Sequence, residues 1–180
     1  MSLTMEEKDH RMSVAGTSGI AALVTLMQTH QQVPGVQEHG CGMLGVLAND
    51  NKDNKYSIAR VGGIEAVITA MQTHAKEAAV QAYACDALAR LAFRHNENQH
   101  AIAAADGITS ILSAMQLHTA DAAVQTNGCG ALLNLAANLE NKKAIARAFG
   151  ISIIEDAMRH HPSVDKMQEY GHAALSCLRR

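Results

Sequence analysis

Three of the four cysteines lie in similar short segments that could hold a metal, form a disulfide or supply a nucleophile. Cys41 and Cys129 each stand between two glycines, and Cys85 lies midway between them, at steps of 44 residues. A disulfide needs Cα atoms within about 7 Å, and zinc needs sulfur atoms about 2.3 Å from the ion. Equivalent helices in a stack of repeats lie about 8 to 10 Å apart, which separates the thiols too widely for either. We therefore predict a buried column of free thiols, with Cys177 as the exposed one.

The same segments give little support to a catalytic thiol or a phosphate-binding loop. His39, the nearest candidate base, lies two residues from Cys41, which on a helix directs it about 160° away from the thiol. A phosphate-binding loop places its glycines between a strand and a helix and adds a lysine, whereas Gly-Cys-Gly is flanked by helix-forming residues. The sequence predicts no catalytic residue, no enzymatic activity and no cofactor.

The 10 histidines offer a second possible metal site, but their placement favours a structural role. His30, His74, His118 and His160 recur at intervals of 42 to 44 residues. All four are expected at the ends of helices, where an imidazole can hydrogen-bond free carbonyl groups. No Cys-x-x-Cys or His-x-x-x-His pattern accompanies them, so we predict no bound metal.

Composition indicates which elements must position these residues. The chain has 180 residues, of which 48% are hydrophobic and 3% aromatic, and it contains no Trp. Such a chain can bury a sizeable core by close packing of helices through small and aliphatic side chains, which predicts an all-α class. The formal net charge of −2 gives no reason to expect nucleic acid or an anionic membrane surface as a partner.

Targeting signals are not apparent. No apolar run approaches the roughly 20 residues of a membrane span, and the N-terminus lacks the apolar centre of a signal peptide. We expect a cytoplasmic protein, with the nucleus as an alternative. Residues 1–9 are interpreted as a tag or a partial leading segment, since Met-Ser-Leu at 1–3 is typical of an expression-vector remnant.

The chain repeats itself every 43 or 44 residues. One segment occurs as GIAALVTLMQTH at Gly19, GIEAVITAMQTH at Gly63, GITSILSAMQLH at Gly107 and GISIIEDAMRHH at Gly150. The segments before and after it keep the same phase, although RMSVAGTSGI at Arg11 is a weak copy. Four units, at about residues 10–53, 54–97, 98–140 and 141–180, are predicted to form a single domain over residues 10–180, because no unit can bury its apolar faces alone.

Each unit is predicted to contain three helices. In the second unit, a short helix over 54–60 is ended by Gly62 and Gly63, which can adopt the positive φ that closes a helix. A second helix over 64–74 has apolar residues at i, i+3, i+4 and i+7. A longer third helix over 78–93 completes the unit.

This pattern resembles the armadillo repeat over roughly residues 10 to 178. The matching pieces are N-K/Q-x-x-I-x-x-x-G-G-I, an aliphatic second helix, and V-Q-x-x-x-x-x-A-L-x-N-L-A, which is most complete at Val124 to Ala136. HEAT repeats are the near alternative, but they have two helices and lack the short helix closed by Gly-Gly-Ile. The resemblance implies a right-handed α-solenoid whose third helices line a concave groove, where extended peptides or partner helices usually bind.

The resemblance also implies two columns of groove residues, an Asn that grips a peptide backbone and a Trp four residues before it. The Asn column here reads Val46, Arg90, Asn134 and Cys177, and the Trp column reads Gly42, Asp86, Gly130 and Ala173. Only one unit keeps the Asn, and none keeps the Trp. A carrier of nuclear localisation signals of the importin type is therefore not expected.

Nine residues are predicted to line a partner-binding groove. They are Glu38, Gly42, Tyr83, Asp86, Arg90, Thr126, Asn127, Gly130 and Asn134. Tyrosine among mixed polar residues is typical of binding surfaces. Asp86 and Arg90, four residues apart, form either a solvated pair worth about 0.3 to 0.5 kcal/mol or a contact for a partner, and both interpretations stay open.

The glycines beside the cysteines are expected to serve packing. A glycine inside a helix costs about 0.5 to 1 kcal/mol relative to alanine, so each needs a local reason. Gly40 and Gly128 are predicted to admit close approach of the preceding helix of the same repeat. Gly42 and Gly130 are predicted to widen the floor of the groove.

The end of the sequence leaves two functions open. Leu175, Leu178 and the last second helix are expected to form an uncovered apolar edge, as in a fragment of a longer array or a surface that stacks on another copy. The first hypothesis is a non-enzymatic protein-protein interaction scaffold or adaptor that binds an extended peptide or a helix in its groove. The alternative is a structural spacer or self-assembly module that uses end-to-end stacking of repeats.

Overall fold

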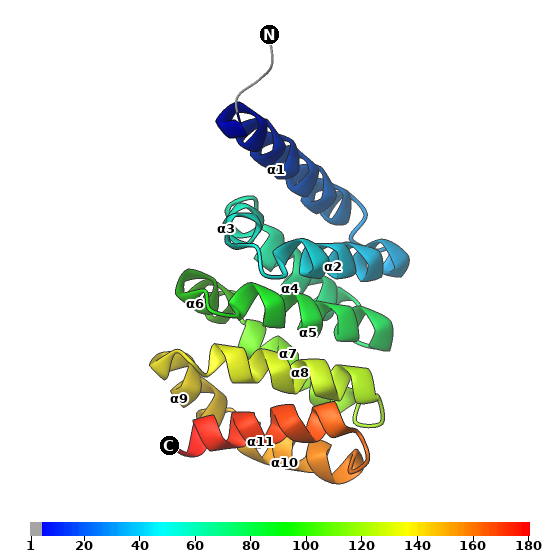
Figure 1. Cartoon of the computed structure of the whole chain (residues 1–180). Helices are drawn as coiled ribbons and strands as arrows, with labels where there is room; N and C mark the ends of the chain where they lie inside the picture. Colours follow the sequence, from blue (N-terminus) through cyan, green and yellow to red (C-terminus); the bar gives the residue numbers. More distant parts are fainter. Residues whose placement is uncertain (1–4) are drawn as a thin grey trace.

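The structure, a computed structural model, describes residues 5–180, with side chains from Gly16 onward except that of Thr17. The predicted segment Met-Ser-Leu at 1–3 lies outside these residues. Within 5–180 the chain forms helices and no strand (Figure 1). The helices are α1 (Met5–Thr29), α2 (Pro34–Ala48), α3 (Lys52–Arg60), α4 (Gly63–Thr73), α5 (Ala78–Ala92), α6 (Asn96–Ala104), α7 (Gly107–Leu117), α8 (Ala122–Leu135), α9 (Leu139–Arg147), α10 (Gly150–His160) and α11 (Asp165–Arg179).

These helices stack as the predicted all-α solenoid. The third helices α2, α5, α8 and α11 lie side by side in chain order, with the second helices α4, α7 and α10 behind them and the first helices α3, α6 and α9 along one edge (Figure 1). One continuous apolar core runs through the stack. Each repeat thus buries its apolar faces against its neighbours.

The turn between the first and second helices depends on two different positions. The first position has positive φ in every unit after the first, at Gly62 (81°), Asp106 (62°) and Phe149 (60°), so the predicted left-handed turn is confirmed at Gly62. The second position is always glycine. A Cβ on Gly63 would lie 2.5 Å from Cγ2 of Ile58 and 2.9 Å from its carbonyl oxygen, so this glycine is required by close packing.

The first unit lacks this turn. Helix α1 continues from Met5 to Thr29 through Gly19, so the prediction of a separate first helix that ends before Gly19 is wrong. Among the described atoms, none would lie within 4 Å of a Cβ on Gly19. The continuous helix thus has no counterpart, among the described atoms, of the close contact between Ile58 and Gly63.

Glutamines at one repeat position cap the C-termini of the helices before them. Nε2 of Gln81 donates to the carbonyl oxygens of Met71 at 3.0 Å and His74 at 2.9 Å, and Gln37, Gln125 and Gln168 make the equivalent pairs of bonds. These glutamines therefore satisfy the free carbonyl groups of each helix C-terminus. The glutamine of the sequence pattern V-Q marks this position, but its hydrogen bonds to the helix carbonyl groups are seen only in the structure.

Histidines at the ends of the second helices bond carbonyl groups, as predicted, but these carbonyl groups belong to the preceding repeat. Nε2 of His74 hydrogen-bonds the carbonyl oxygen of Gln31 at 2.7 Å, and His118 bonds that of Ala75 at 2.7 Å. In the last repeat His161, and not His160, occupies this position and bonds Thr119. The predicted His160 instead meets a carbonyl of its own helix, at Asp156. The aligned segments GIEAVITAMQTH and GISIIEDAMRHH both end at this position, so the repeat itself matches His161 to His74, and the prediction of His160 was one residue out of register.

The predicted uncovered apolar edge at the last repeat is also wrong at its two leucines. Leu175 and Leu178 are only 7% and 6% exposed, because α11 turns both side chains toward the core. Arg179 pairs with Glu155 of α10 on the outer side. Among the described residues, none of the helices has the length and apolarity needed to cross a bilayer.

Candidate peptide-binding groove on the third helices

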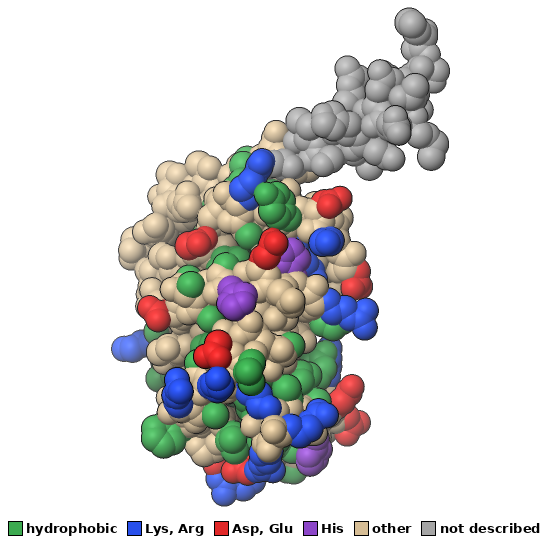
Figure 2. Space-filling model, turned by 90° about the vertical axis from the view of Figure 1, so that its left-hand side faces the viewer, with side chains coloured by type: hydrophobic (Ala, Val, Ile, Leu, Met, Phe, Trp, Pro, Cys, Tyr) green, Lys and Arg blue, Asp and Glu red, His purple; other side chains and the backbone are tan. Residues whose placement is uncertain are grey.

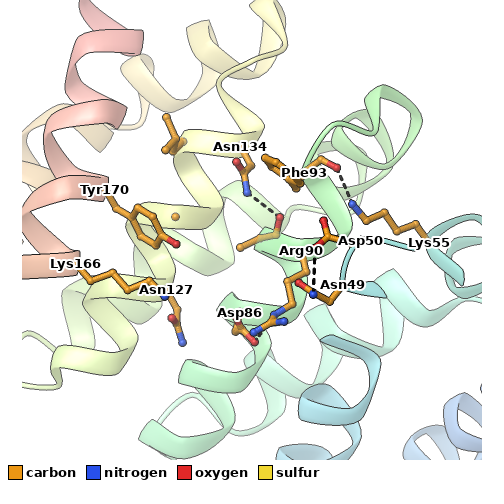
Figure 3. A pocket seen from close by; sticks show the side chains of 13 residues that line it. Asn49, Asp50, Lys55, Asp86, Arg90, Phe93, Asn127, Asn134, Lys166 and Tyr170 are labelled. Atoms are coloured by element: carbon orange, nitrogen blue, oxygen red, sulfur yellow. Dashed lines mark hydrogen bonds and ion pairs between the residues drawn. The ribbon is translucent and has the colours of Figure 1, made fainter. Parts of the chain in front are cut away.

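The third helices form a hollow of about 430 Å³ that crosses the solenoid from the α2–α3 connection to α11 (Figure 3). It brings together five of the nine predicted groove residues, Asp86, Arg90, Asn127, Gly130 and Asn134. They come from α5 and α8, which lie side by side in the middle of the stack. The regular 44-residue step is what places them on one surface.

Asp86 and Arg90 form an ion pair along α5. Nε of Arg90 lies 2.8 Å from Oδ2 of Asp86, and the two side chains are 35% and 30% exposed. The predicted pairing is therefore present, and its partial exposure limits its own stabilising contribution to a few tenths of a kcal/mol. Only the Nε side of the guanidinium is engaged within the described part of the chain, so the terminal nitrogens remain for a ligand.

Asn127 and Asn134 point across to α5. Nδ2 of each donates to a carbonyl oxygen of that helix, Ala82 for Asn127 and Ala89 for Asn134, both at 2.9 Å. Each amide thereby orders its own side chain and keeps its oxygen and a second N–H group for another partner. The predicted role of Asn134 is thus restricted to the half of its amide that faces the hollow (Figure 3).

One end of the hollow contains a buried lysine that the sequence prediction missed. Nζ of Lys55 donates to the carbonyl oxygen of Phe93 at 2.7 Å and lies 5.4 Å from the centre of its ring. Burial lowers the pKa of Lys55, while the nearby Asp50 acts in the opposite direction. Arg94 approaches the same ring at 5.0 Å. Lys55 and Phe93 are 38 residues apart, so only the stacking of repeats reveals this contact.

A second hollow of about 390 Å³ lies between α2 and α5. It contains three further predicted residues, Glu38, Gly42 and Tyr83. Its remaining lining includes Met43 and Val46, which are 54% and 70% exposed. The sequence reading placed Val46 in the Asn column but did not identify this apolar surface.

Tyrosines cover the glycines that were predicted to widen the groove. A Cβ on Gly42 would lie 3.3 Å from Cδ1 of Tyr83, and a Cβ on Gly130 would lie 3.1 Å from the ring of Tyr170. The prediction of a wider floor is therefore wrong, because the next repeat fills the space with an aromatic ring. The other pair behaves as predicted: a Cβ on Gly40 would lie 2.6 Å from Cγ of Met27 in the preceding helix, and Gly128 meets Met115 in the same way.

Thr126 is the one predicted residue that does not line the groove. Thr126 is 8% exposed and lines neither hollow. Helix α8 is packed between α5 and α11, so more of its surface is covered than on a terminal helix. Glu38, at the same repeat position on α2, lines its hollow because nothing of the described chain covers that side in the same way.

The thiols are held as protonated core groups. Cys41, Cys85 and Cys129 are fully buried, which confirms the predicted column, and burial raises the pKa of Cys41 and of Cys129 to about 12. A thiol with so high a pKa supplies almost no thiolate for catalysis near neutral pH. Cys177 was predicted to be the exposed thiol; it is the least buried of the four, but it is half-buried and donates to the carbonyl oxygen of Ala136 at 3.5 Å. Across the described residues, no three His, Cys, Asp or Glu side chains are grouped so as to hold a metal.

The face formed by the first helices has a mixed surface. Basic side chains gather toward its C-terminal half, but acidic and apolar side chains lie among them (Figure 2). A surface that follows a nucleic-acid backbone is normally a continuous basic stripe. This face does not present one, so the groove stays the better candidate site.

Comparisons with known proteins agree with this architecture. No curated protein matches the chain. Three crystal structures of engineered proteins from the Northeast Structural Genomics Consortium resemble it, with TM-scores of 0.78, 0.78 and 0.76 and sequence identities of 25%, 22% and 25%. The matches cover 90%, 89% and 90% of this chain but only 63%, 63% and 38% of those chains. The GAC ARM domain model matches residues 8–180. The chain therefore belongs to the GAC ARM domain family, an armadillo-type helical repeat.

Proposed function

We propose that this chain is a non-enzymatic protein-protein interaction scaffold that binds an extended peptide or a helix of another protein in the groove of its third helices. The observation that carries the proposal is the central hollow, where Arg90, Asn127 and Asn134 keep unused hydrogen-bonding groups on a surface that crosses all four units. Fixed polar groups with spare donors and acceptors suit a peptide backbone, which carries both.

The dimensions of the groove support an extended segment in particular. Third helices in such a stack are about 8 to 10 Å apart, so the path from α2 to α11 measures roughly 25 to 30 Å. An extended chain advances about 3.3 Å per residue and would cross this path with about eight or nine residues. A segment of that length is typical of peptide recognition by a preformed surface.

The proposal includes a cytoplasmic or nuclear location and a single domain over residues 10–180. Four free cysteines, three of them fully buried, suit a reducing compartment. Binding of nucleic acid or membrane is not part of the proposed function. The alternative, self-assembly by end-to-end stacking, relied on exposed Leu175 and Leu178, and with both buried no observation favours it.

Site-specific photo-crosslinking tests this function. A benzophenone amino acid is placed at Tyr83 in the groove, or at the exposed Thr109 on α7 as a control, and the chain is irradiated in an extract of its source organism. We expect defined adducts from position 83 that disappear when Arg90→Glu and Asn134→Ala are added, and none of these adducts from position 109. Equal adducts from both positions, or adducts that survive the two changes, would contradict groove binding.

A further inference from the structure

The groove is chemically divided along its length. Met43, Val46, Leu47 and Tyr83 give the hollow between α2 and α5 an apolar lining, in which Glu38 is the only acidic residue and no lysine or arginine occurs. The central hollow is polar and carries charges of both signs. Two neighbouring compartments of such different chemistry favour a ligand whose side chains differ in the same order.

The apolar compartment depends on two residues of the first repeat, Met43 and Val46, whose counterparts in the next two repeats are buried or polar. Val46 holds the repeat position that Arg90 and Asn134 hold in the next two repeats, and it is 70% exposed. Met43 is 54% exposed, whereas Ala87 and Ala131, at its equivalent positions, are fully buried. Exposed apolar side chains gathered around a hollow mark a site for an apolar partner group.

The central compartment favours a negative charge. Its lining has the cations Lys55, Arg90 and Lys166 against the acids Asp50 and Asp86, although the whole chain has a formal charge of −2. Lys55 is held by the carbonyl oxygen of Phe93 and lies near Asp50, and Arg90 pairs with Asp86 through Nε alone. The ammonium group of Lys166, 5.4 Å from the ring of Tyr170, and the terminal nitrogens of Arg90 are left to meet a carboxylate.

We propose that the groove selects an extended segment of a partner protein in which a bulky apolar side chain lies two or four residues from an acidic side chain. The inference rests on the proposed function and specifies its ligand. Side chains of an extended chain that face the same surface recur every second residue, at about 6.6 and 13 Å for i+2 and i+4. These distances bracket the roughly 8 to 10 Å between neighbouring third helices, so the apolar group fits the hollow of α2 and α5 while the carboxylate reaches Arg90.

Selection from a phage-displayed library of random dodecapeptides on the full chain tests this inference. We expect enriched peptides to share a Leu, Met or Phe and an Asp or Glu at one of these two spacings. In fluorescence anisotropy, labelled copies of them should lose at least tenfold in affinity for Val46→Ser and for Arg90→Glu. Leu117→Ser on α7, which changes an equally apolar and 56% exposed residue outside the groove, should bind as the unchanged chain does. Circular dichroism of each variant verifies that the helices are intact.

The possible results separate the inference from the proposed function. Peptides that depend on Arg90 but lack the apolar and acidic pair, or that bind Val46→Ser normally, would overturn the inference and leave groove binding in place. Enriched peptides that bind every groove variant normally would overturn both, as would a library that yields no binder. Affinity that falls with added salt, and loses this dependence when the peptide acid is replaced by Asn or Gln, supports the carboxylate contact.

Discussion

The ring of Tyr83 lies over Gly42 of the preceding repeat, with Cδ1 at 3.3 Å from the position that a Cβ would take. Tyr170 covers Gly130 in the same way, 3.1 Å from the equivalent point. Between these pairs the same two positions hold Asp86 and Asn127, which line the polar hollow. Gly-Cys-Gly therefore has two structural roles: the cysteine packs as a buried thiol in the core, and the second glycine leaves space for an aromatic side chain of the next repeat.

Gly63→Ala is expected to destabilise the chain, because its Cβ would collide with Cγ2 and the carbonyl oxygen of Ile58. Overpacking of a rigid site typically costs about 1 to 3 kcal/mol. Gly19→Ala is the matched control, since it has the same repeat position but open space, and should stabilise α1 by about 0.5 to 1 kcal/mol. Urea unfolding followed by circular dichroism measures both. Equal effects of the two changes would refute the steric explanation.

Gln81→Met should lower the free energy of unfolding by about 2 to 3 kcal/mol, because it removes two hydrogen bonds worth roughly 1 kcal/mol each and leaves buried carbonyl groups unsatisfied. Gln168→Met deletes the equivalent bonds at a half-buried position, where water can replace them, and should cost less. Chemical denaturation of the two variants provides the comparison. A larger loss for Gln168→Met would argue against the importance of burial.

The sequence predicted the helices well because they depend on local signals that recur at a fixed step. Apolar spacing and the Gly-Ile dipeptide predicted the second helix over 64–74, against the observed Gly63–Thr73. Contacts between repeats were predicted poorly. Tyr83 meets Gly42, and Lys55 meets Phe93, across about one repeat of sequence, and their side-chain directions depend on how the helices stack.

Errors at the ends of the array have a related cause. Three helices were predicted for every unit, although the close contact of Ile58 with Gly63 has no counterpart at Gly19 among the described atoms. Leu175 and Leu178 were expected to form an uncovered apolar edge, although α11 directs both inward. The repeat pattern describes a unit with neighbours on both sides, so it carries least information about units at either end.

The buried thiols predict a specific dependence of stability on pH. The pKa of Cys41 and of Cys129 rises from the ordinary 9.0 to about 12 on folding. Since the folded pKa is the higher one, the unfolded chain loses these protons first as the pH rises above 9, so the contribution of these two thiols to the free energy of unfolding should be constant below about pH 8 and fall between 9 and 12. A variant with Cys41→Ala and Cys129→Ala should show a shallower fall in urea titrations at these pH values. An identical fall in both chains would assign the effect to other groups.

Alkylation of the native protein checks the same thiols individually. Cys177 is half-buried, so iodoacetamide at pH 8 should label it long before Cys41, Cys85 and Cys129, whose burial hinders both access and ionisation. Mass spectrometry of tryptic fragments gives the four rates. All four should become equal in urea, which serves as the control. Fast labelling of Cys85 in the native chain would contradict the buried column.

Phe149→Asn is expected to stabilise the chain. Phe149 has φ of 60° and is 75% exposed, so it combines a left-handed conformation with few packing contacts. That conformation costs an L-residue roughly 1 to 2 kcal/mol, and Asn tolerates it better. The equivalent positions hold Gly62 and Asp106, which suit the turn.

Thermal unfolding should show a Tm higher by about 2 to 4 °C, as expected for roughly 1 kcal/mol in a chain of this size. Gly62→Ala, the reverse change, should lower the Tm. A lower Tm for Phe149→Asn would contradict this prediction. It would mean that the ring of Phe149 stabilises the fold by more than the left-handed conformation costs, through contacts in the hollow that it lines with Ser152 and Ile153.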